Sequence, residues 1–156
     1  MSDVIPFDEE ESFYSLFITI YQNNQEAINV SMSLVKVLHI WDDLIDLDKK
    51  INDEDINSAF MAALVDIGTS PLWDKEVAGL FRSVYCKWKA ACAVEENKEA
   101  PKESKRLAYV ARAGFYDIFY HFAYRIGGRK WAEEMSPIIL QWYGENYDDY
   151  CKEFWG

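Results

Sequence analysis

Long stretches of this sequence carry apolar residues every three or four positions, and the rare glycines and prolines fall between those stretches. This spacing is typical of amphipathic helices, whereas strands alternate apolar and polar residues. No strand-like alternation longer than a few residues occurs, and no internal repeat is evident. The pattern therefore predicts an all-α fold, closed as a helical bundle.

Six helices are expected from the apolar spacing and from the residues that begin and end helices. Short polar side chains cap helix starts, proline favours the first helical position, and glycine ends helices. The expected ranges are 9–22, 25–47, 52 or 53 to 66, 71–96, one that follows the polar loop 95–105 and ends at Gly127–Gly128, and a last segment from 129 that restarts at Ser136–Pro137. The side chains expected to be buried include Phe13, Phe17, Ile20, Tyr21, Ile28, Val35, Leu38, Trp41, Ile45, Phe115, Phe119, Phe122 and Ile126.

The length and composition fit one globular domain, a single helical bundle over residues 1–156. With 156 residues, 50% of them hydrophobic, the chain can bury one sizeable core. Its three cysteines form no C-x-x-C pair, which argues against a disulfide framework or a zinc site and favours a reducing compartment. The sequence has neither a secretory signal nor an apolar run of bilayer length, so we expect a cytoplasmic protein without a membrane partner.

The formal net charge of −11 disfavours binding to nucleic acid, because the phosphate backbone would be repelled. The lysines and arginines are scattered and form no basic patch. An acidic surface that meets a basic partner is compatible with this charge.

An acidic cluster lies near the end of the second expected helix. His39, Asp42, Asp43 and Asp46 are spaced i, i+3, i+4 and i+7, which places them on one helical face. Neighbouring carboxylates suit Mg²⁺, which prefers oxygen ligands and charge compensation. Negative charge at a helix C-terminus is locally unfavourable, and a bound cation would relieve it. The alternative interpretations are a solvated acidic face and, for His39, a core residue with one hydrogen bond.

A second acidic stripe is expected on the last helix, where Glu145, Asp149 and Glu153 recur every four residues with Asp148 beside them. In a bundle, two such stripes can supply ligands to one metal from two helices. An ordinary solvated face is again the alternative. The basic residues Arg112 and Arg125, expected on one helix, are candidates for contacting a phosphate; a surface ion pair is their alternative role.

The run Asp42-Asp43-Leu-Ile-Asp46 resembles the D-D-x-x-D motif of class I isoprenoid synthases. That resemblance implies aspartates that hold magnesium ions on a substrate diphosphate. The stripe of Glu145, Asp149 and Glu153 has the spacing of the family's second metal motif but departs from it at Glu145 and Asp149, and these enzymes are about twice as long. The run from His39 to Asp46 also looks like small uncharacterised all-α proteins of phage and bacterial genomes, which implies a viral or metagenomic origin and no particular activity.

Two functions are therefore expected as alternatives. The first is magnesium-dependent binding or hydrolysis of a small molecule that bears a diphosphate, either prenyl or nucleotide, through Asp42, Asp43 and Asp46. The second is a non-catalytic interaction protein whose acidic surface docks on a basic partner. The sequence leaves open whether the chain forms a homo-oligomer.

Overall fold

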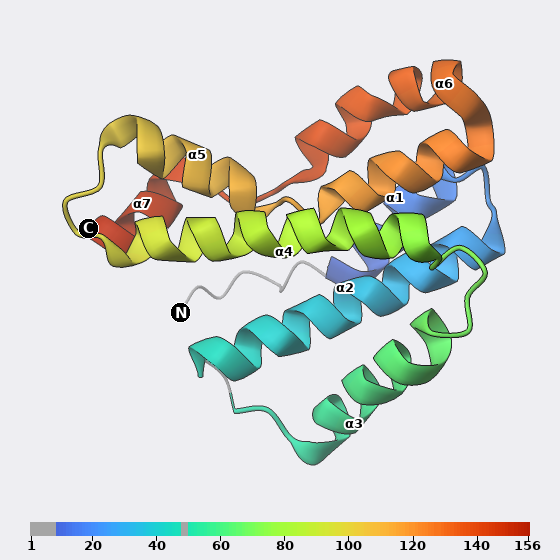
Figure 1. The fold of residues 1–156 in the computed structure, drawn as a ribbon, viewed down its shortest axis with the longest axis horizontal. Helices are drawn as coiled ribbons and strands as arrows, with labels where there is room; N and C mark the ends of the chain where they lie inside the picture. The colour runs from blue at the N-terminus through green and yellow to red at the C-terminus, as the bar shows by residue number, and fades with distance from the viewer. Residues whose placement is uncertain (1–8, 48–49) are drawn as a thin grey trace. The chain divides into compact units, whose positions relative to one another are not determined.

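The structure, a computed structural model, describes residues 9–47 and 50–156 and is helical almost throughout (Figure 1). The predicted all-α fold is confirmed, and the described residues contain no strand. They form seven α-helices, where about six helices are predicted. The elements are α1 (Glu9–Ile20), α2 (Gln25–Asp46), α3 (Asp53–Met61), the π-helical segment η1 (Ala62–Ile67), α4 (Lys75–Glu96), α5 (Lys102–Arg112), α6 (Tyr116–Trp142) and α7 (Tyr147–Trp155).

Contacts between residues divide the chain into two compact units, residues 1–74 and residues 75–156. The N-terminal unit contains α1, α2, α3 and η1, and the C-terminal unit contains α4 to α7. This division is finer than the single bundle expected from the sequence, and the domain assignment stays a prediction. The three cysteines are free thiols.

The core of the N-terminal unit begins with an aromatic ladder on α1. The rings of Phe13 and Phe17 stack with centroids 5.7 Å apart, and those of Phe17 and Tyr21 with centroids 5.4 Å apart. All three side chains are buried as predicted, and α1 packs on α2. The buried Tyr21 hydroxyl is hydrogen-bonded to Ser31 Oγ of α2 at 2.8 Å, so the polar end of the ladder is satisfied.

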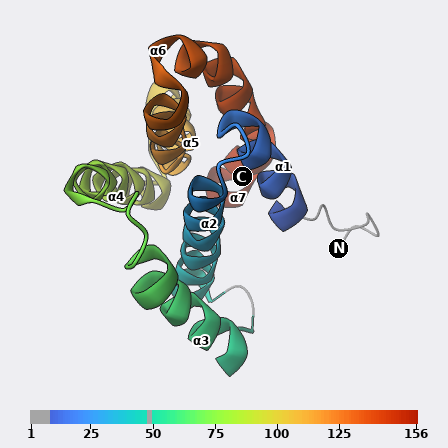
Figure 2. The ribbon, with the colours of Figure 1, turned by 90° about the vertical axis from the view of Figure 1, so that its right-hand side faces the viewer.

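α2 and α3 are both capped as the sequence indicates. Asn24 Oδ1 accepts from the Ala27 amide at 3.1 Å, and Asn52 Oδ1 accepts from the Asp55 amide at 2.8 Å. The chain from α3 continues into η1, and the pair packs along α2 (Figure 2). The buried side chains of α3 and η1 are Ala59, Ala62 and Ile67.

The outer end of α2 differs from the expectation. Trp41 and Ile45 were expected inside, and both are exposed. Leu44 and Leu47 are also exposed, Leu47 at 82%. Leu47 is the C-cap of α2 and has a left-handed backbone conformation. The apolar spacing of α2 therefore predicts burial correctly for Ile28 and Val35 and fails in the last two turns.

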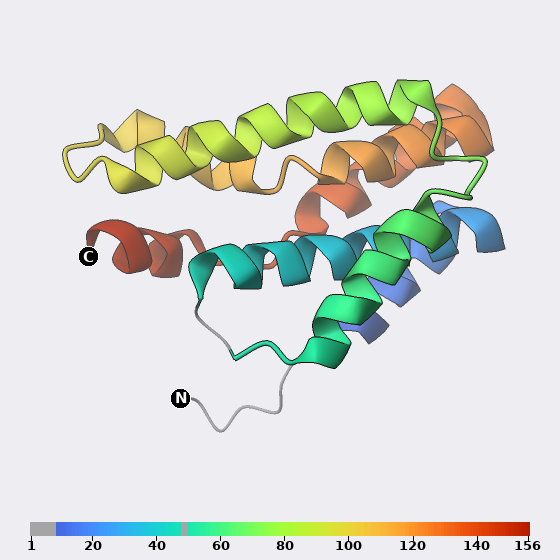
Figure 3. The same ribbon diagram turned by 60° about the horizontal axis from the view of Figure 1, so that its bottom comes forward.

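In the C-terminal unit, α5 packs along α4 (Figure 3), and Lys87 Nζ of α4 donates to Asp117 of α6 at 2.8 Å. The single helix expected before Gly127–Gly128 is divided in two, because residues 113–115 separate α5 from α6, whereas its predicted end is confirmed by the break at Gly128. α4 starts at Lys75 and not at Pro71. Phe119 and Phe122 are buried as predicted, whereas Phe115 and Ile126 are only half-buried.

The break within α6 lies at Gly128, whose φ of 85° and ψ of −177° suit glycine and interrupt the helical path. The predicted restart at Pro137 is wrong, since Pro137 lies inside the helical run. Ser136 Oγ next to it donates to the Ala132 carbonyl at 2.5 Å, which is the side-chain bond to the preceding turn that helical serines make.

Candidate functional site

The first acidic cluster lies on one uninterrupted helix, as the spacing requires. His39, Asp42, Asp43 and Asp46 all belong to α2, and the last turn of α2 has no basic residue. Asp42 and Asp43 are half-buried and Asp46 is exposed. The half-buried His39 ring lies 6.4 Å from the Phe13 ring, centroid to centroid, which favours its interpretation as a packing residue. Negative side chains therefore crowd the negative end of the helix dipole.

Exposed apolar side chains accompany these aspartates. Trp41, Leu44, Ile45 and Leu47 are all exposed on the last two turns of α2 and its cap. This end of the N-terminal unit thus presents acidic and apolar groups on the same short segment. The sequence indicates this exposure, because the apolar residues at positions 41, 44, 45 and 47 are spread around the helix more widely than one buried stripe.

The second acidic stripe is arranged differently from the prediction. Glu145 precedes α7 and lies outside any helix, so it does not share a helical stripe with Asp149 and Glu153. Asn146 is the cap of α7, and its Oδ1 accepts from the Asp149 amide at 3.1 Å. Asp148 and Asp149 are exposed in the first turn, where carboxylates favour the positive end of the helix dipole.

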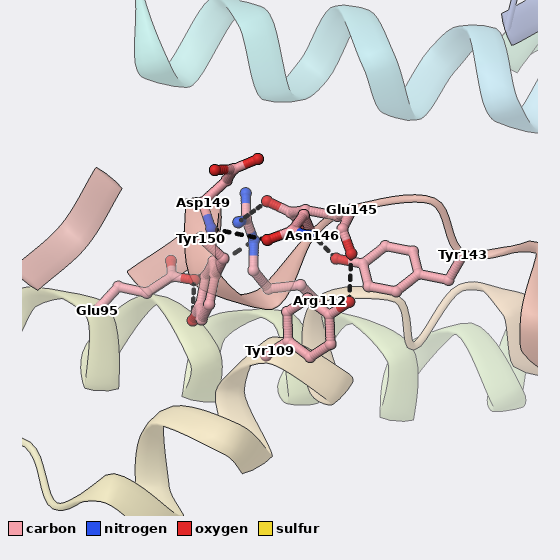
Figure 4. A network of polar contacts seen from close by, with 8 residues as sticks. All are labelled: Glu95, Tyr109, Arg112, Tyr143, Glu145, Asn146, Asp149 and Tyr150. Atoms are coloured by element: carbon pink, nitrogen blue, oxygen red, sulfur yellow. Dashed lines mark hydrogen bonds and ion pairs between the residues drawn. The ribbon is translucent and has the colours of Figure 1, made fainter. Parts of the chain in front are cut away.

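Glu145 instead belongs to a network centred on Arg112, shown in Figure 4. Arg112 of α5 contacts Glu145 Oε1 at 3.0 Å through Nη1 and Glu95 Oε2 of α4 at 3.4 Å through Nε. Its guanidinium also lies over the Tyr150 ring, 5.1 Å from the centroid. Arg112 therefore joins two carboxylates and an aromatic ring from three parts of the C-terminal unit.

Three tyrosine hydroxyls complete the network. Tyr150 donates to Glu95 Oε2 at 2.8 Å, Tyr143 donates to the Glu145 carboxylate, and Tyr109 donates to the Glu145 carbonyl (Figure 4). Burial raises the pKa of Glu95, and the Tyr150 hydrogen bond and the Arg112 charge only partly offset this. Each polar group has a partner within the unit, which indicates a structural clamp more than an open site.

The C-terminal helix α7 (Tyr147–Trp155) also contacts the turn that follows α4. Lys98 Nζ donates to the Phe154 carbonyl at 2.8 Å, and Trp155 Nε1 donates to the Asn97 carbonyl at 2.9 Å. Tyr150 is fully buried in a cluster with Ala91 and Ala108. The Arg112 network thus holds α7 against α4 and α5.

The remaining predicted site residues are not brought together with Arg112. Arg125 is exposed on α6, and the helix break at residues 113–115 separates it from Arg112 of α5, so the two arginines do not share one helix. Glu153 is exposed on α7, and the acidic cluster of α2 belongs to the other unit. Within residues 9–47 and 50–156, no group of three or more histidine, cysteine, aspartate or glutamate side chains is placed to hold a metal ion.

The chain matches no protein-family model, and no curated protein or solved structure is significantly similar to it. None of the helices in the described part of the chain has the length and apolarity needed to cross a bilayer. In its described residues the protein is all-α. The C-terminal end of α2, in the N-terminal unit, carries acidic and exposed apolar side chains, and the C-terminal unit contains an internal network centred on Arg112.

Proposed function

We propose that this chain is a non-catalytic interaction protein of the cytoplasm whose N-terminal unit binds a basic protein partner. The observation that carries the proposal is the end of α2, where Asp43 and Asp46 stand among the exposed side chains of Leu44, Ile45 and Leu47. Apolar surface supplies the larger part of the affinity in such contacts, and surrounding charge supplies selectivity and association rate.

The local charge supports a basic partner. From Ile51 to Asp74 the sequence has no lysine or arginine, whereas Asp53, Glu54 and Asp55 open α3 and Asp66 lies in η1. A hollow of about 450 Å³ in the same unit is lined by Glu26 and Asp66, by hydroxyl and amide side chains and by the apolar Val30 and Met32, with no basic residue among them. A cationic surface would gain favourable contacts along this unit and an anionic one would lose them.

The proposal is tested with a synthetic basic helix as the probe. We define the Leu–Lys peptide as an amphipathic peptide of about four helical turns, with leucine every three or four positions and lysine elsewhere. It should bind at low salt and weaken steeply as salt rises through about 0.1 to 1 M, where the Debye length falls from about 10 to 3 Å. The measurement is a fluorescence titration with labelled peptide; absence of low-salt binding contradicts the proposal.

A magnesium-dependent diphosphate-binding function is a second candidate, supported by one observation. Asp42, Asp43 and Asp46 lie on consecutive turns of one helix whose last turn lacks a basic residue, in the arrangement of the D-D-x-x-D motif that the sequence resembles. In this proposal the three aspartates hold Mg²⁺, and the ion holds a prenyl or nucleotide diphosphate.

The metal proposal is tested by thermal unfolding with Mg²⁺ and pyrophosphate. A specific ligand at about 100 times its Kd stabilises the folded state by about 2.7 kcal/mol, so the melting temperature should rise measurably. The double variant Asp42→Asn, Asp46→Asn should lose this rise, and the control Glu103→Gln, Glu134→Gln, exposed in the other unit, should keep it. An equal rise in both variants contradicts the metal assignment.

A further inference from the structure

The outward face of α3 and η1 is apolar and exposed. Phe60, Met61, Leu64 and Val65 are all exposed, Leu64 at 73%, while Ala59, Ala62 and Ile67 of the same segment are buried. The bulky side chains at positions 60, 61, 64 and 65 thus face solvent, whereas Ala59, Ala62 and Ile67 face inward. Contiguous apolar patches on a folded surface mark interaction sites more often than chance exposure does.

These four side chains form two rows at helical spacing. Phe60 and Leu64 are four residues apart, as are Met61 and Val65, so each pair lies one turn apart on one side of the helix. The rows continue across the change from α-helix to π-helix at Ala62, a local widening that is frequent at functional sites. A helix of another protein can pack on such a face by setting its own side chains between the two rows.

Negative charge marks one end of this face. Asp53 precedes Asn57 by four residues, and Asn57 precedes Met61 by four, so the acidic first turn of α3 lies on the same side as the apolar rows. Glu54 is next to Asp53, and both are exposed. Lys50 precedes them in the sequence, and no lysine or arginine occurs between residues 51 and 74.

We propose that this face, which we call the α3–η1 docking face (Asp53, Glu54, Phe60, Met61, Leu64 and Val65), binds an amphipathic helix of a partner protein with lysine or arginine at the end that meets Asp53 and Glu54. The inference rests on the proposed function and assigns its contact surface and partner chemistry. Helices with apolar residues at i, i+3 or i+4 and i+7 are a recurrent class of protein ligand.

Charge selects this occupant over a second copy of the chain. A second copy would bring its own α3 and η1, which hold only acidic and neutral residues, against Asp53 and Glu54. Two chains of formal charge −11 also repel each other at long range. A helix with basic residues instead satisfies the acidic end while its apolar side covers the rows.

The test compares Leu64→Ser with Leu107→Ser in titrations with the Leu–Lys peptide. Leu107 of α5 is a matched control because it is exposed at 71%, almost as much as Leu64. Both are surface changes, so both variants should fold, which circular dichroism checks. Leu64→Ser should weaken binding at least about tenfold, because a leucine buried in the complex is lost, whereas Leu107→Ser should leave it unchanged. Phe60→Ser should repeat the effect of Leu64→Ser.

The outcomes separate this inference from the proposed function. If the wild type binds the peptide in a salt-dependent way and Leu64→Ser binds equally well, the docking face is overturned while the proposed function stands. If the wild type does not bind the peptide at all, both are overturned. If sedimentation shows a dimer that Leu64→Ser dissociates, a second copy covers the face and the assignment to a basic partner is wrong.

Discussion

Replacing Arg112 with alanine is expected to destabilise the C-terminal unit by about 3 to 5 kcal/mol at neutral pH, the usual loss when one partner of a buried ion pair is removed. The side chain of Glu95 is only 8% exposed and would keep its hydrogen bond from Tyr150 but lose its nearby positive charge. Glu145, which is more exposed, contributes less to the loss. Urea unfolding followed by circular dichroism measures the change.

The loss should depend on pH in a defined direction. Burial raises the pKa of Glu95 in the folded protein above that in the unfolded chain. Such a group favours folding below its unfolded pKa and loses that contribution as pH rises through its folded pKa. Removing Arg112 raises the folded pKa of Glu95 further, so the variant should recover part of its stability when the pH falls to about 4.

Two variants control this prediction. Arg129→Ala removes an ion pair with Glu133 in which both side chains are more than 60% exposed, and it should change stability by less than about 1 kcal/mol. Adding Glu95→Gln to Arg112→Ala removes the buried charge and should restore part of the lost stability. Equal effects of Arg112→Ala and Arg129→Ala would show that the network is not a structural clamp.

Neutralising the acidic residues near the junction of α2 and α3 should weaken binding of the Leu–Lys peptide about a hundredfold at low salt. An exposed charge pair contributes about 0.5 kcal/mol, so six pairs contribute about 3 kcal/mol, which corresponds to roughly that factor. Asn52, the cap of α3, is left in place so that the helix still begins correctly. The six residues changed to their amides are Asp42, Asp43, Asp46, Asp53, Glu54 and Asp55.

A matched variant separates this local effect from that of net charge. It neutralises six acidic residues exposed in the C-terminal unit, which again takes the formal charge from −11 to −5, and should bind nearly as well as the wild type. Equal weakening of the two variants would assign binding to overall charge. The control residues are Glu96, Glu99, Glu103, Glu134, Asp148 and Asp149.

Helix formation was largely predictable because it depends on nearby residues. The cap at Asn52 and the ends of α2 and α4 follow from local side-chain chemistry and apolar spacing. The break between α5 and α6 does not follow from the apolar spacing, although Gly114 lies in it: a Cβ there would approach the Ala111 carbonyl oxygen to 3.0 Å. Pro137 lies within the helical run, so the proline does not mark a helix boundary in this chain.

The candidate sites were predictable only in part. The common helix of Asp42, Asp43 and Asp46 follows from their spacing. Asn146, a capping residue followed by acidic residues, indicates that α7 begins after Glu145. The pairing of Arg112 with Glu95 and Glu145 was not readable, because tertiary folding brings together residues that are distant in sequence.

The exposure of the α3–η1 docking face could not be predicted from the sequence. Residues 59–65 are apolar on every side of the helix, so their periodicity does not say which side is covered. The structure buries Ala59 and Ala62 and leaves Phe60 and Leu64 exposed. Small residues allow close packing of α3 and η1 on α2, and the bulky side chains are left facing outward.

The most direct measurement of the central claim is the salt dependence of Leu–Lys peptide binding for the wild type and the two charge-neutralised variants. If the acidic residues of α2 and α3 attract the partner, the variant in which they are neutralised should give a markedly flatter plot of log Kd against log salt concentration than the wild type. The variant neutralised in the C-terminal unit should give nearly the same slope as the wild type. Three plots of equal slope would contradict a basic partner bound by the N-terminal unit.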